Sequence, residues 1–279
     1  MNFFLANPEP GYCLIDAGDG KRYENWGGVL VSRPDPSVIW PARKNNWKPS
    51  LIHIRASNGS GQWQNKPDKS WKAQIGEYNF IIRPTDFKHM GVFPEQEANW
   101  RFIKGALKKN MRVLNLFAYT GGATIAAISS GAQATHIDAS KGANAWAREN
   151  IIINNFEPAR ILTDDCRKFL KRENARGNKY DAVILDPPSY GRGPGGEIWK
   201  LETGLFDLLL AVREILSQNC AFVLINSYTT GISPIAVENV ARAAFEGLRF
   251  SYESGYLALP ILNSDLVLPA GCSVRIIAL

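Results

Sequence analysis

One segment, residues 112–140, constrains the fold of this chain more than any other feature of its sequence. It reads RVLNLFAYTGGATIAAISSGAQATHIDAS. The apolar run at 112–117 is typical of a strand buried on both faces of a sheet. After a glycine turn, the small residues of 123–130 predict a helix that packs closely on the sheet, and 134–137 predict a second strand that ends at Asp138. This order predicts the first half of a nucleotide-binding βαβ unit, although an ordinary βαβ crossover would show the same pattern.

The glycine turn and the acidic residue after it indicate the kind of ligand. A dinucleotide site has the spacing GxGxxG, which places a pyrophosphate on the N-terminus of the helix. Here Gly121 and Gly122 are adjacent instead. Asp138 follows Gly121 by 17 residues, near the offset of about 20 that is usual for a residue binding ribose hydroxyls. The turn therefore favours a nucleotide without phosphates, such as S-adenosylmethionine.

Strands and helices alternate through the rest of the chain after residue 77. Further apolar runs predict strands at 160–163, 181–185, 221–226, 250–259 and 273–279. Helices are predicted at 139–155, 166–175, 201–217 and 234–247, with Ser140 as an N-cap. This alternation predicts an α/β fold with a doubly wound, mostly parallel sheet, of the Rossmann-like type.

Residues 1–76 have a different composition and predict a small β-rich N-terminal module ahead of a catalytic domain at 77–279. Short β-like runs at 12–16, 29–32, 38–40 and 51–55 are separated by turn signals, which predicts mostly antiparallel strands. Tryptophans are interleaved with basic residues, as at Lys44, Trp47 and Lys48. Such a mixture can stack on bases and bind phosphates of RNA, but tryptophans in a thin core beneath solvated lysines would give the same pattern.

Polar residues end five successive apolar strands of the predicted sheet. Ligands of such sheets bind outside the carboxyl ends of the strands. Strand ends are turns, where Asp and Asn are common, but five in succession predict a binding site. In chain order these ends carry Asn115–Gly122, Asp138, Asp164 with Asp165, Asp186–Pro188 and Asn226–Tyr228.

The segment Asp186-Pro187-Pro188 is the sharpest signal after the opening unit. Two prolines fix φ and remove two N–H donors, so the carbonyls before them are presented rigidly to a ligand. An amino group needs acceptors of this kind, and Tyr190 is placed to stack on a flat substrate. A proline-rich turn with a satisfied aspartate is the structural alternative.

Composition limits the remaining classes of function and partner. The chain has 279 residues and a net charge of +6, which suits either a polyanionic partner or an ordinary basic enzyme. It contains no run of 18 apolar residues and no apparent secretory signal, so we expect no membrane partner. The cysteines at 13, 166, 220 and 272 form no CxxC pair, which predicts free thiols in a cytoplasmic protein and no metal site.

The motifs NLFAYTGG, HIDAS, ILTDD and LDPPSYG resemble those of class I S-adenosylmethionine-dependent methyltransferases. The segment HMGVFPEQ before the first strand narrows the resemblance to the group around the large-subunit ribosomal RNA methyltransferases I and K. The resemblance covers residues 77–279. It implies a seven-stranded sheet whose last strand is antiparallel, S-adenosyl-L-methionine as the cofactor, and RNA, with ribosomal RNA favoured, as the substrate.

The same resemblance implies roles for individual residues. It assigns the loop after the first strand to the methionine part of the cofactor, Asp138 to the ribose, and Asp165 or its neighbour Asp164 to the adenine amino group. The residues so assigned to the cofactor are Gln96, Asn115, Phe117, Ala118, Tyr119, Thr120, Gly121, Asp138, Ser140, Asp164 and Asp165. Those assigned to catalysis are Asp186, Pro187, Pro188 and Tyr190.

One departure from the family pattern concerns the chemistry. Methylation at cytosine C5 needs a cysteine nucleophile, which relatives with that activity carry after the fifth strand, whereas Ile225–Tyr228 contains none. We therefore expect transfer to a nitrogen. A small-molecule or protein methyltransferase, a non-catalytic RNA-binding protein that keeps the fold, and a nicotinamide-dependent reductase are the alternatives. The acidic strand ends argue against a pure binder, and the missing GxGxxG argues against the reductase.

Overall fold

The chain folds into two units in the computed structural model, which describes residues 2–43, 46–55, 61–86, 88–192 and 198–279. The first unit comprises Met1–Phe4, Asn99–Tyr256 and Gly271–Leu279. The second comprises Leu5–Ala98 and Leu257–Ala270. The domain boundary predicted between residues 76 and 77 stays a prediction about which parts fold independently.

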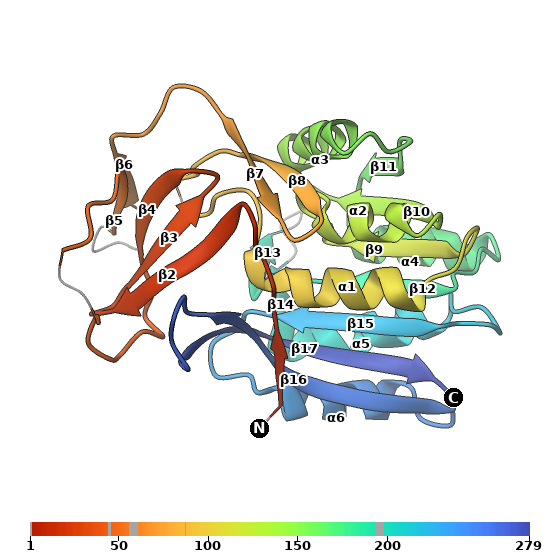
Figure 1. Ribbon diagram of the computed structural model, residues 1–279. Helices are drawn as coiled ribbons and strands as arrows, with labels where there is room; N and C mark the ends of the chain where they lie inside the picture. The colour runs from red at the N-terminus through yellow and green to blue at the C-terminus, as the bar shows by residue number, and fades with distance from the viewer. Residues whose placement is uncertain (1, 44–45, 56–60, 87, 193–197) are drawn as a thin grey trace. The chain divides into compact units, whose positions relative to one another are not determined.

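A large sheet forms the centre of the first unit (Figure 1). Its strand order is β1 (Phe3–Leu5), β16 (Phe250–Pro260), β17 (Val267–Ala278), β15 (Phe222–Ser227), β12 (Ala182–Leu185), β9 (Arg112–Leu116), β10 (Gln133–Asp138) and β11 (Arg160–Thr163). The strands from β15 to β11 are parallel, and β17 runs antiparallel to β15. The predicted doubly wound, mostly parallel sheet is confirmed, and the three-residue β1 adds an eighth strand to the seven expected.

Helices cover both faces of this sheet because its strands are apolar on both sides. The helices are α1 (Glu97–Ala106), α2 (Gly122–Ser129), α3 (Lys141–Ile153), α4 (Cys166–Ala175), α5 (Leu201–Arg213) and α6 (Pro234–Ala244). Leu114 and Leu116 of β9 join a core built with side chains of α4, α5 and α6. Asn115, which points to the opposite face, donates to Thr124 of α2. The loops that carry the predicted site residues therefore extend from a sheet that is packed on both faces.

Helix α5 differs from its predicted bounds and ends at Arg213 instead of Ser217. Leu216 forms a parallel bridge with Tyr180, and the Ser217 N–H donates to the Tyr180 carbonyl at 2.9 Å. The residues after the helix thus pair with the backbone just before β12. This pairing depends on the tertiary structure, so the local sequence pattern does not indicate it.

The second unit contains a five-stranded sheet and a hairpin. The sheet comprises β2 (Tyr12–Gly18), β3 (Lys21–Trp26), β4 (Val29–Pro34), β5 (Leu51–Arg55) and β6 (Gly61–Gln64), and the hairpin β7 (Trp71–Ile75) and β8 (Tyr78–Ile82). Only the β4–β5 pair of the sheet is parallel among those described. The strand predicted at 38–40 is wrong: it forms a loop between Pro36 and Pro41, and prolines interrupt strand ladders.

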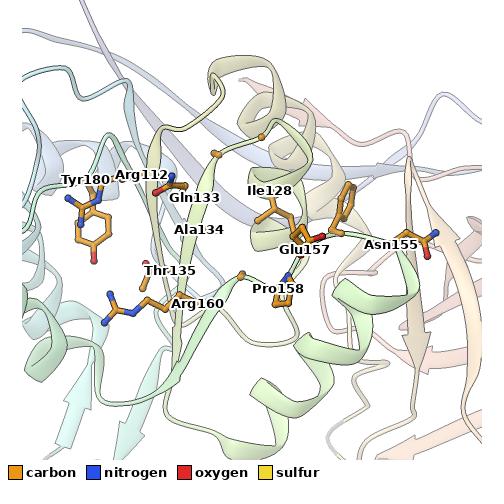
Figure 2. A pocket seen from close by; sticks show the side chains of 14 residues that line it. Arg112, Ile128, Gln133, Ala134, Thr135, Asn155, Glu157, Pro158, Arg160 and Tyr180 are labelled. Atoms are coloured by element: carbon orange, nitrogen blue, oxygen red, sulfur yellow. The ribbon is translucent and has the colours of Figure 1, made fainter.

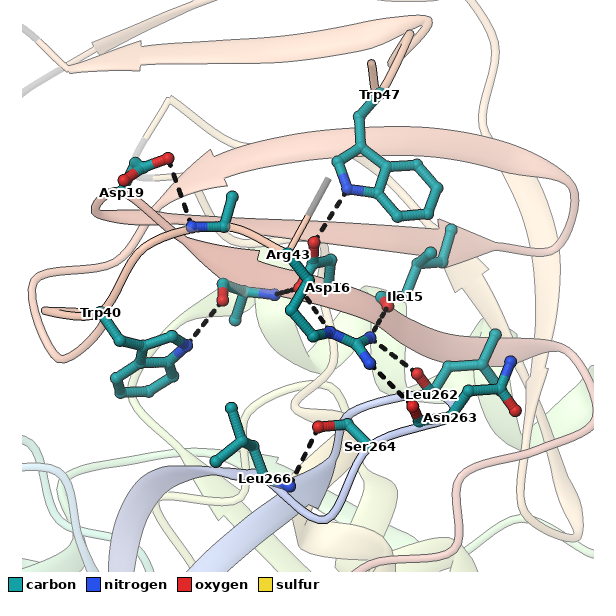
Figure 3. Close-up of polar contacts among 12 residues, drawn as sticks. Ile15, Asp16, Asp19, Trp40, Arg43, Trp47, Leu262, Asn263, Ser264 and Leu266 are labelled. Atoms are coloured by element: carbon teal, nitrogen blue, oxygen red, sulfur yellow. Dashed lines mark hydrogen bonds and ion pairs between the residues drawn. The ribbon is translucent and has the colours of Figure 1, made fainter. Parts of the chain in front are cut away.

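Buried charged groups stabilise the second unit together with its apolar core. Arg33 donates two hydrogen bonds of 2.7 Å to the carboxylate of Glu24, which also accepts from the Tyr12 hydroxyl at 2.8 Å. Arg43 donates to the carboxylate of Asp16 at 3.3 Å and to two backbone carbonyls in the 257–270 segment, at 2.7 and 2.8 Å (Figure 3). These bonds explain how that segment belongs to a unit formed mainly by the first third of the chain.

The tryptophans of the second unit have internal partners. Four indole N–H groups donate as follows: Trp40 to the Ala17 carbonyl at 2.6 Å, Trp47 to Asp16 at 3.1 Å, Trp63 to the Thr85 carbonyl at 2.7 Å and Trp71 to the Trp26 carbonyl at 2.7 Å. The fifth ring, that of the buried Trp26, packs edge-on against Tyr12, and its N–H has no partner among the described residues. This pattern favours a structural role for the rings. RNA binding at Trp47 and Lys48 stays a prediction, and Lys44 lies outside the described residues.

Candidate functional site

The predicted site residues of the first unit gather at the carboxyl ends of its parallel strands. Strand β9 has β10, the next strand in the chain, on one side and β12 on the other (Figure 1). Such a reversal of strand order is a topological switch point, where open α/β sheets bind ligands. The segments that reach this edge are 117–121 after β9, Asp138 at the end of β10, 164–165 after β11 and 186–188 after β12.

The loop after β9 has an unusual backbone conformation. Phe117 and Tyr119 have φ values of 56° and 51°, in the left-handed region that non-glycine residues rarely adopt. Such a conformation persists only where neighbouring groups fix it. The contacts that fix it are Phe117 N–H to Cys166 Sγ at 3.3 Å, Ala118 N–H to the Ile137 carbonyl at 3.1 Å, Tyr119 N–H to Asp138 Oδ2 at 2.9 Å and Asn150 Nδ2 to the Thr120 carbonyl at 2.9 Å.

Asp138 combines a structural role with free acceptor capacity. Its Oδ2 accepts the Tyr119 N–H at 2.9 Å, and its Oδ1 accepts the Ser140 N–H at 2.8 Å. The Ser140 hydroxyl in turn caps α3 by accepting the Ala143 N–H at 3.2 Å. An ionised carboxylate has about four lone-pair sites, so this half-buried group can still accept from two ribose hydroxyls. The site therefore fits a nucleoside ligand.

The two adjacent glycines are required for close packing. Gly121 has a φ of 90°, and a Cβ there would lie 3.1 Å from the Cβ of Ala147. A Cβ at Gly122 would lie 2.7 Å from Cζ2 of the buried Trp100. The first turn of α2 thus sits against an indole ring and a helix, which explains why glycine stands at both positions.

We expect Gly122→Ala to destabilise the protein by about 1–3 kcal/mol, because the new methyl group overlaps Trp100 in a packed core. Urea unfolding followed by circular dichroism measures the change. Gly105→Ala is the matched control, since an exposed helical glycine with no atom near its added Cβ should be neutral or stabilised by replacement. Equal unfolding midpoints for both variants would contradict the packing argument.

The two acidic residues after β11 both have local partners. Asp165 caps α4 by accepting the Lys168 N–H at 2.9 Å. Asp164 pairs with Arg172 and accepts the Asp165 N–H at 2.9 Å. Both carboxylates lie at the same strand end, as the sequence predicted, and the assignment of the adenine amino group to one of them stays a prediction.

The loop after β12 is fixed by hydrogen bonds to two other segments. The Asp186 N–H donates to the Leu116 carbonyl at 3.4 Å, which ties the loop to the end of β9. The Thr229 hydroxyl donates to Ser189 Oγ at 2.8 Å, so the segments after β12 and β15 are in contact. Tyr190 lies in the short strand β13 (Tyr190–Arg192), and 49% of its surface is exposed. The stacking of Tyr190 on a planar substrate stays a prediction.

Trp199 connects the two functional loops and was not predicted from the sequence. It lies in β14 (Ile198–Lys200), which pairs with β13. Its Nε1 donates to the Pro188 carbonyl at 2.6 Å, and its ring lies 6.1 Å from the ring of Phe117. A Cβ at Gly204 would come within 2.4 Å of the indole, so that glycine makes room for it. The glycine-rich loop before Trp199, residues 193–197, lies outside the described residues.

Three of the four cysteines are buried in the first unit. Cys166 lies under the Phe117 N–H, and burial raises the pKa of its thiol well above the usual range. Cys220 precedes the amino end of β15. Cys272 pairs with Ser227 across the β15–β17 ladder, near Asp186, and burial raises the pKa of its thiol to about 11. These thiols are protonated near neutral pH.

Gln96 belongs to the second unit, in the 3-10 helix η1 (Pro94–Gln96). The helix starts after Phe93, and the Gln96 N–H donates to the Phe93 carbonyl at 3.1 Å. Its side chain is buried, with 8% of its surface exposed. The cofactor contact expected for Gln96 stays a prediction.

A cavity of about 640 Å³ lies at the opposite edge of the sheet (Figure 2). Arg112, Gln133 and Arg160, the first residues of β9, β10 and β11, line it. It is therefore separate from the carboxyl ends that carry the site. Within the described ranges, no three His, Cys, Asp or Glu side chains gather as a metal site requires. None of the described helices is long and apolar enough to span a membrane.

This fold and this set of strand ends define a nucleoside-binding α/β protein of the methyltransferase type. The chain belongs to the S-adenosylmethionine-dependent methyltransferase family, whose profile matches residues 39–250. The class and the cofactor implied by the sequence motifs are confirmed.

Curated relatives are named Ribosomal RNA large subunit methyltransferase K/L. The protein from Syntrophotalea carbinolica is 27% identical over 201 residues, which cover 68% of this chain and 28% of that protein. The protein from Shewanella frigidimarina is 28% identical over 205 residues, which cover 71% of this chain and 28% of that protein. The chain thus spans just over a quarter of the length of these relatives.

Solved structures agree with the fold. The S-adenosylmethionine-dependent methyltransferase from Agrobacterium tumefaciens is 32% identical and superposes with a TM-score of 0.94 over 99% of this chain and 93% of that one. SMU.776, solved with S-adenosylhomocysteine, is 16% identical and has a TM-score of 0.77 over 96% of this chain and 76% of that one. The second likeness supports the fold alone.

Proposed function

We propose that this chain methylates a nitrogen of an RNA base, with ribosomal RNA as the substrate, and that it acts in the cytoplasm. The observation that carries the proposal is the meeting of two fixed loops at one strand edge: residues 117–121 beside Asp138, and residues 186–190 after β12. The printed names of the curated relatives support RNA as the substrate class.

The residues present suggest how the cofactor would be held. Asp138 would accept from the ribose hydroxyls with the lone pairs that Tyr119 and Ser140 leave open. The 117–121 backbone would hold the methionine part, and Asp165 or Asp164 would accept from the adenine amino group. S-adenosylmethionine, when bound, supplies an electrophilic methyl group on a sulfonium.

The loop after β12 would position the acceptor base. Asp186 would accept a hydrogen bond from the amino group that is methylated, and the prolines hold the backbone carbonyls of this loop rigidly. Tyr190 would stack on the base, which must leave any helical stack to reach the site. Catalysis would be mainly positioning, which can supply about 7–11 kcal/mol of the barrier.

Incubation of the purified protein with radiolabelled S-adenosylmethionine and total RNA, followed by nucleoside mass spectrometry, tests the proposal. We expect label in a nucleoside methylated at nitrogen. Label in 5-methylcytidine would overturn the nitrogen assignment, and label only in protein or small molecules would overturn RNA as the substrate. RNA already methylated in cells that contain the gene should accept less label than RNA from cells that lack it.

The buried thiols predict catalysis without a covalent adduct. An attacking thiol must be ionised, but burial raises the pKa of Cys166 and Cys272, and the latter to about 11. We expect the variant with all four cysteines replaced by Ala or Ser to keep methyl transfer if it folds. RNA containing 5-fluorocytosine should form no adduct that survives denaturation. An adduct lost on replacing Cys166 or Cys272 alone would restore a C5 mechanism.

RNA affinity should fall steeply as salt rises, because phosphate contacts release counterions. If Lys48 of the second unit meets a phosphate, Lys48→Gln should reduce the slope of log affinity against log salt by about 0.7, the value for one contact on single-stranded RNA. Filter binding at several salt concentrations measures the slope. Lys171→Gln, an exposed lysine on α4, is the control, and equal slopes for both variants would favour a structural role for the N-terminal module.

A further inference from the structure

His136 of β10 lies buried beneath the cofactor loop, and the proposed reaction does not use it. Its side chain has no exposed surface. A Cβ at Gly121 would lie 3.8 Å from His136 Cε1, so the imidazole is directly under the end of the 117–121 loop. A histidine in this position has to be stabilised by specific partners, because burial of an unpaired polar ring costs free energy.

The hydrogen bonds on one side of the ring determine its tautomer. Asn115 Nδ2 donates to Thr124 Oγ1 at 2.9 Å, and Thr124 Oγ1 lies 2.9 Å from His136 Nδ1. An amide nitrogen can only donate, so the threonine oxygen accepts from Asn115 and its single proton is directed to the imidazole. His136 Nδ1 is therefore the acceptor, and the ring proton resides on Nε2.

Two acceptors lie on the other side of the ring. The side chain of Asn144 and the backbone of Tyr119 lie close enough to the imidazole to raise its pKa. Asn144 Nδ2 is engaged by the Asp138 carbonyl at 3.0 Å and by Thr163 Oγ1 at 2.8 Å, which leaves its Oδ1 for a donor. Within the described structure, His136 Nε2 and Asn144 Oδ1 are both buried without a partner of normal geometry, and they are a complementary donor and acceptor.

The imidazole is neutral in this setting. Burial, followed by the smaller effect of the Arg148 charge, lowers the pKa of His136 to about 4 against the opposing effects of Asn144 and Tyr119. A neutral ring with Nε2–H can accept from Thr124 and donate towards Tyr119 at once. A protonated ring carries a hydrogen on each nitrogen, so Nδ1 could not accept the hydrogen bond from Thr124. Two donors would then face each other.

We propose that His136 is a positioning residue for the cofactor site, where the relay Asn115–Thr124–His136 directs an imidazole N–H at the Tyr119 carbonyl. Asp138 holds the N–H of the same residue. Tyr119 is thus restrained at both ends in its left-handed conformation, with a φ of 51°. The inference rests on the proposed cofactor role of the 117–121 loop and adds the buried groups that keep this loop in its binding conformation.

The pair Thr124→Val and Thr124→Ser tests the relay without replacing any of the residues assigned to the cofactor. Valine has nearly the shape of threonine but no hydroxyl, so His136 Nδ1 and Asn115 Nδ2 both lose their partner. We expect Thr124→Val to weaken S-adenosylmethionine about 10-fold in calorimetry, in line with the cost of unsatisfied buried groups. Thr124→Ser, which keeps the hydroxyl, should bind as the wild type does. Thermal unfolding of both variants without cofactor separates a loss of binding from a loss of folding.

Imidazole ¹⁵N chemical shifts of the wild-type protein give a second measurement that needs no variant. They should show His136 protonated at Nε2 and unprotonated at Nδ1 near neutral pH. A proton on Nδ1, or a folded Thr124→Val variant with unchanged affinity, would overturn the inference while the wild type still binds S-adenosylmethionine. A wild type that does not bind S-adenosylmethionine would overturn the proposed function itself.

Discussion

Asp186→Ala should lower the rate constant of methyl transfer by about 100- to 10,000-fold, the range for removing one positioned group that accepts or moves a proton in the transition state. The reason is geometric: the Asp186 N–H is bonded to the end of β9 at 3.4 Å, and the carbonyl two residues on is held by Trp199 at 2.6 Å. In the proposed reaction this carboxylate, on a loop fixed at both ends, would orient the amino group. Single-turnover methylation of RNA with saturating cofactor measures the effect.

The same experiment separates catalysis from binding. We expect Asp186→Ala to bind S-adenosylmethionine with nearly wild-type affinity, because the residues proposed to contact the ribose and the adenine follow β10 and β11. Asp207→Ala, an exposed aspartate on α5, controls for the loss of a negative charge. If affinity fell as much as the rate, Asp186 would be a cofactor ligand, and an unchanged rate would remove it from the site.

Much of the first unit could be predicted from its sequence because its strands are buried on both faces. Continuous apolar runs mark such strands, and the polar residue after each run marks the strand end. Parallel strands bring those ends to one edge, so the list of strand ends was also a list of candidate site residues, whose roles stay predictions. The N-cap predicted at Ser140 is confirmed by the side-chain bond that begins α3, whereas the Asp165 cap of α4 was found only in the structure.

The strands of the second unit were harder to predict because several are polar. β3 reads KRYENW and β6 reads GQWQ, patterns without a continuous apolar face. Their charged side chains are satisfied by distant partners, as Glu24 is by Arg33. Pairing of this kind depends on the tertiary structure, and no local periodicity reports it.

The supporting residues of the site were missed for a related reason. Trp199 follows a glycine-rich loop, and its partners Pro188 and Phe117 are 11 and 82 residues away in the chain. His136 reads in sequence as one polar residue inside a strand. Only the fold shows that both side chains hold the loops that the motifs identify. The motifs therefore predict which atoms meet the ligand, and the structure adds what fixes those atoms in place.

Asp138→Ala should weaken S-adenosylmethionine about 10- to 100-fold, because hydrogen bonds to a charged acceptor contribute about 1.5–3 kcal/mol. The effect has two sources in this structure. The variant loses the lone pairs available to the ribose, and it releases the N–H groups of Tyr119 and Ser140 that bind to the carboxylate at 2.9 and 2.8 Å. The loop proposed to hold the methionine part would then lose one of the bonds that keep Tyr119 left-handed.

The variant Asp138→Asn tests whether the lost hydrogen bonds, or only the lost negative charge, weaken cofactor binding. Both protein partners of Asp138 are donors that approach different oxygens, so an amide must turn its own donor NH₂ towards either Tyr119 or Ser140. We therefore expect the asparagine variant to bind nearly as poorly as the alanine variant, despite its similar shape. Calorimetric titration with S-adenosylmethionine measures both, and Glu157→Gln at the opposite edge of the sheet is the control for charge. Wild-type affinity in a folded Asp138→Asn variant would show that one oxygen suffices and that the ribose contact lies elsewhere.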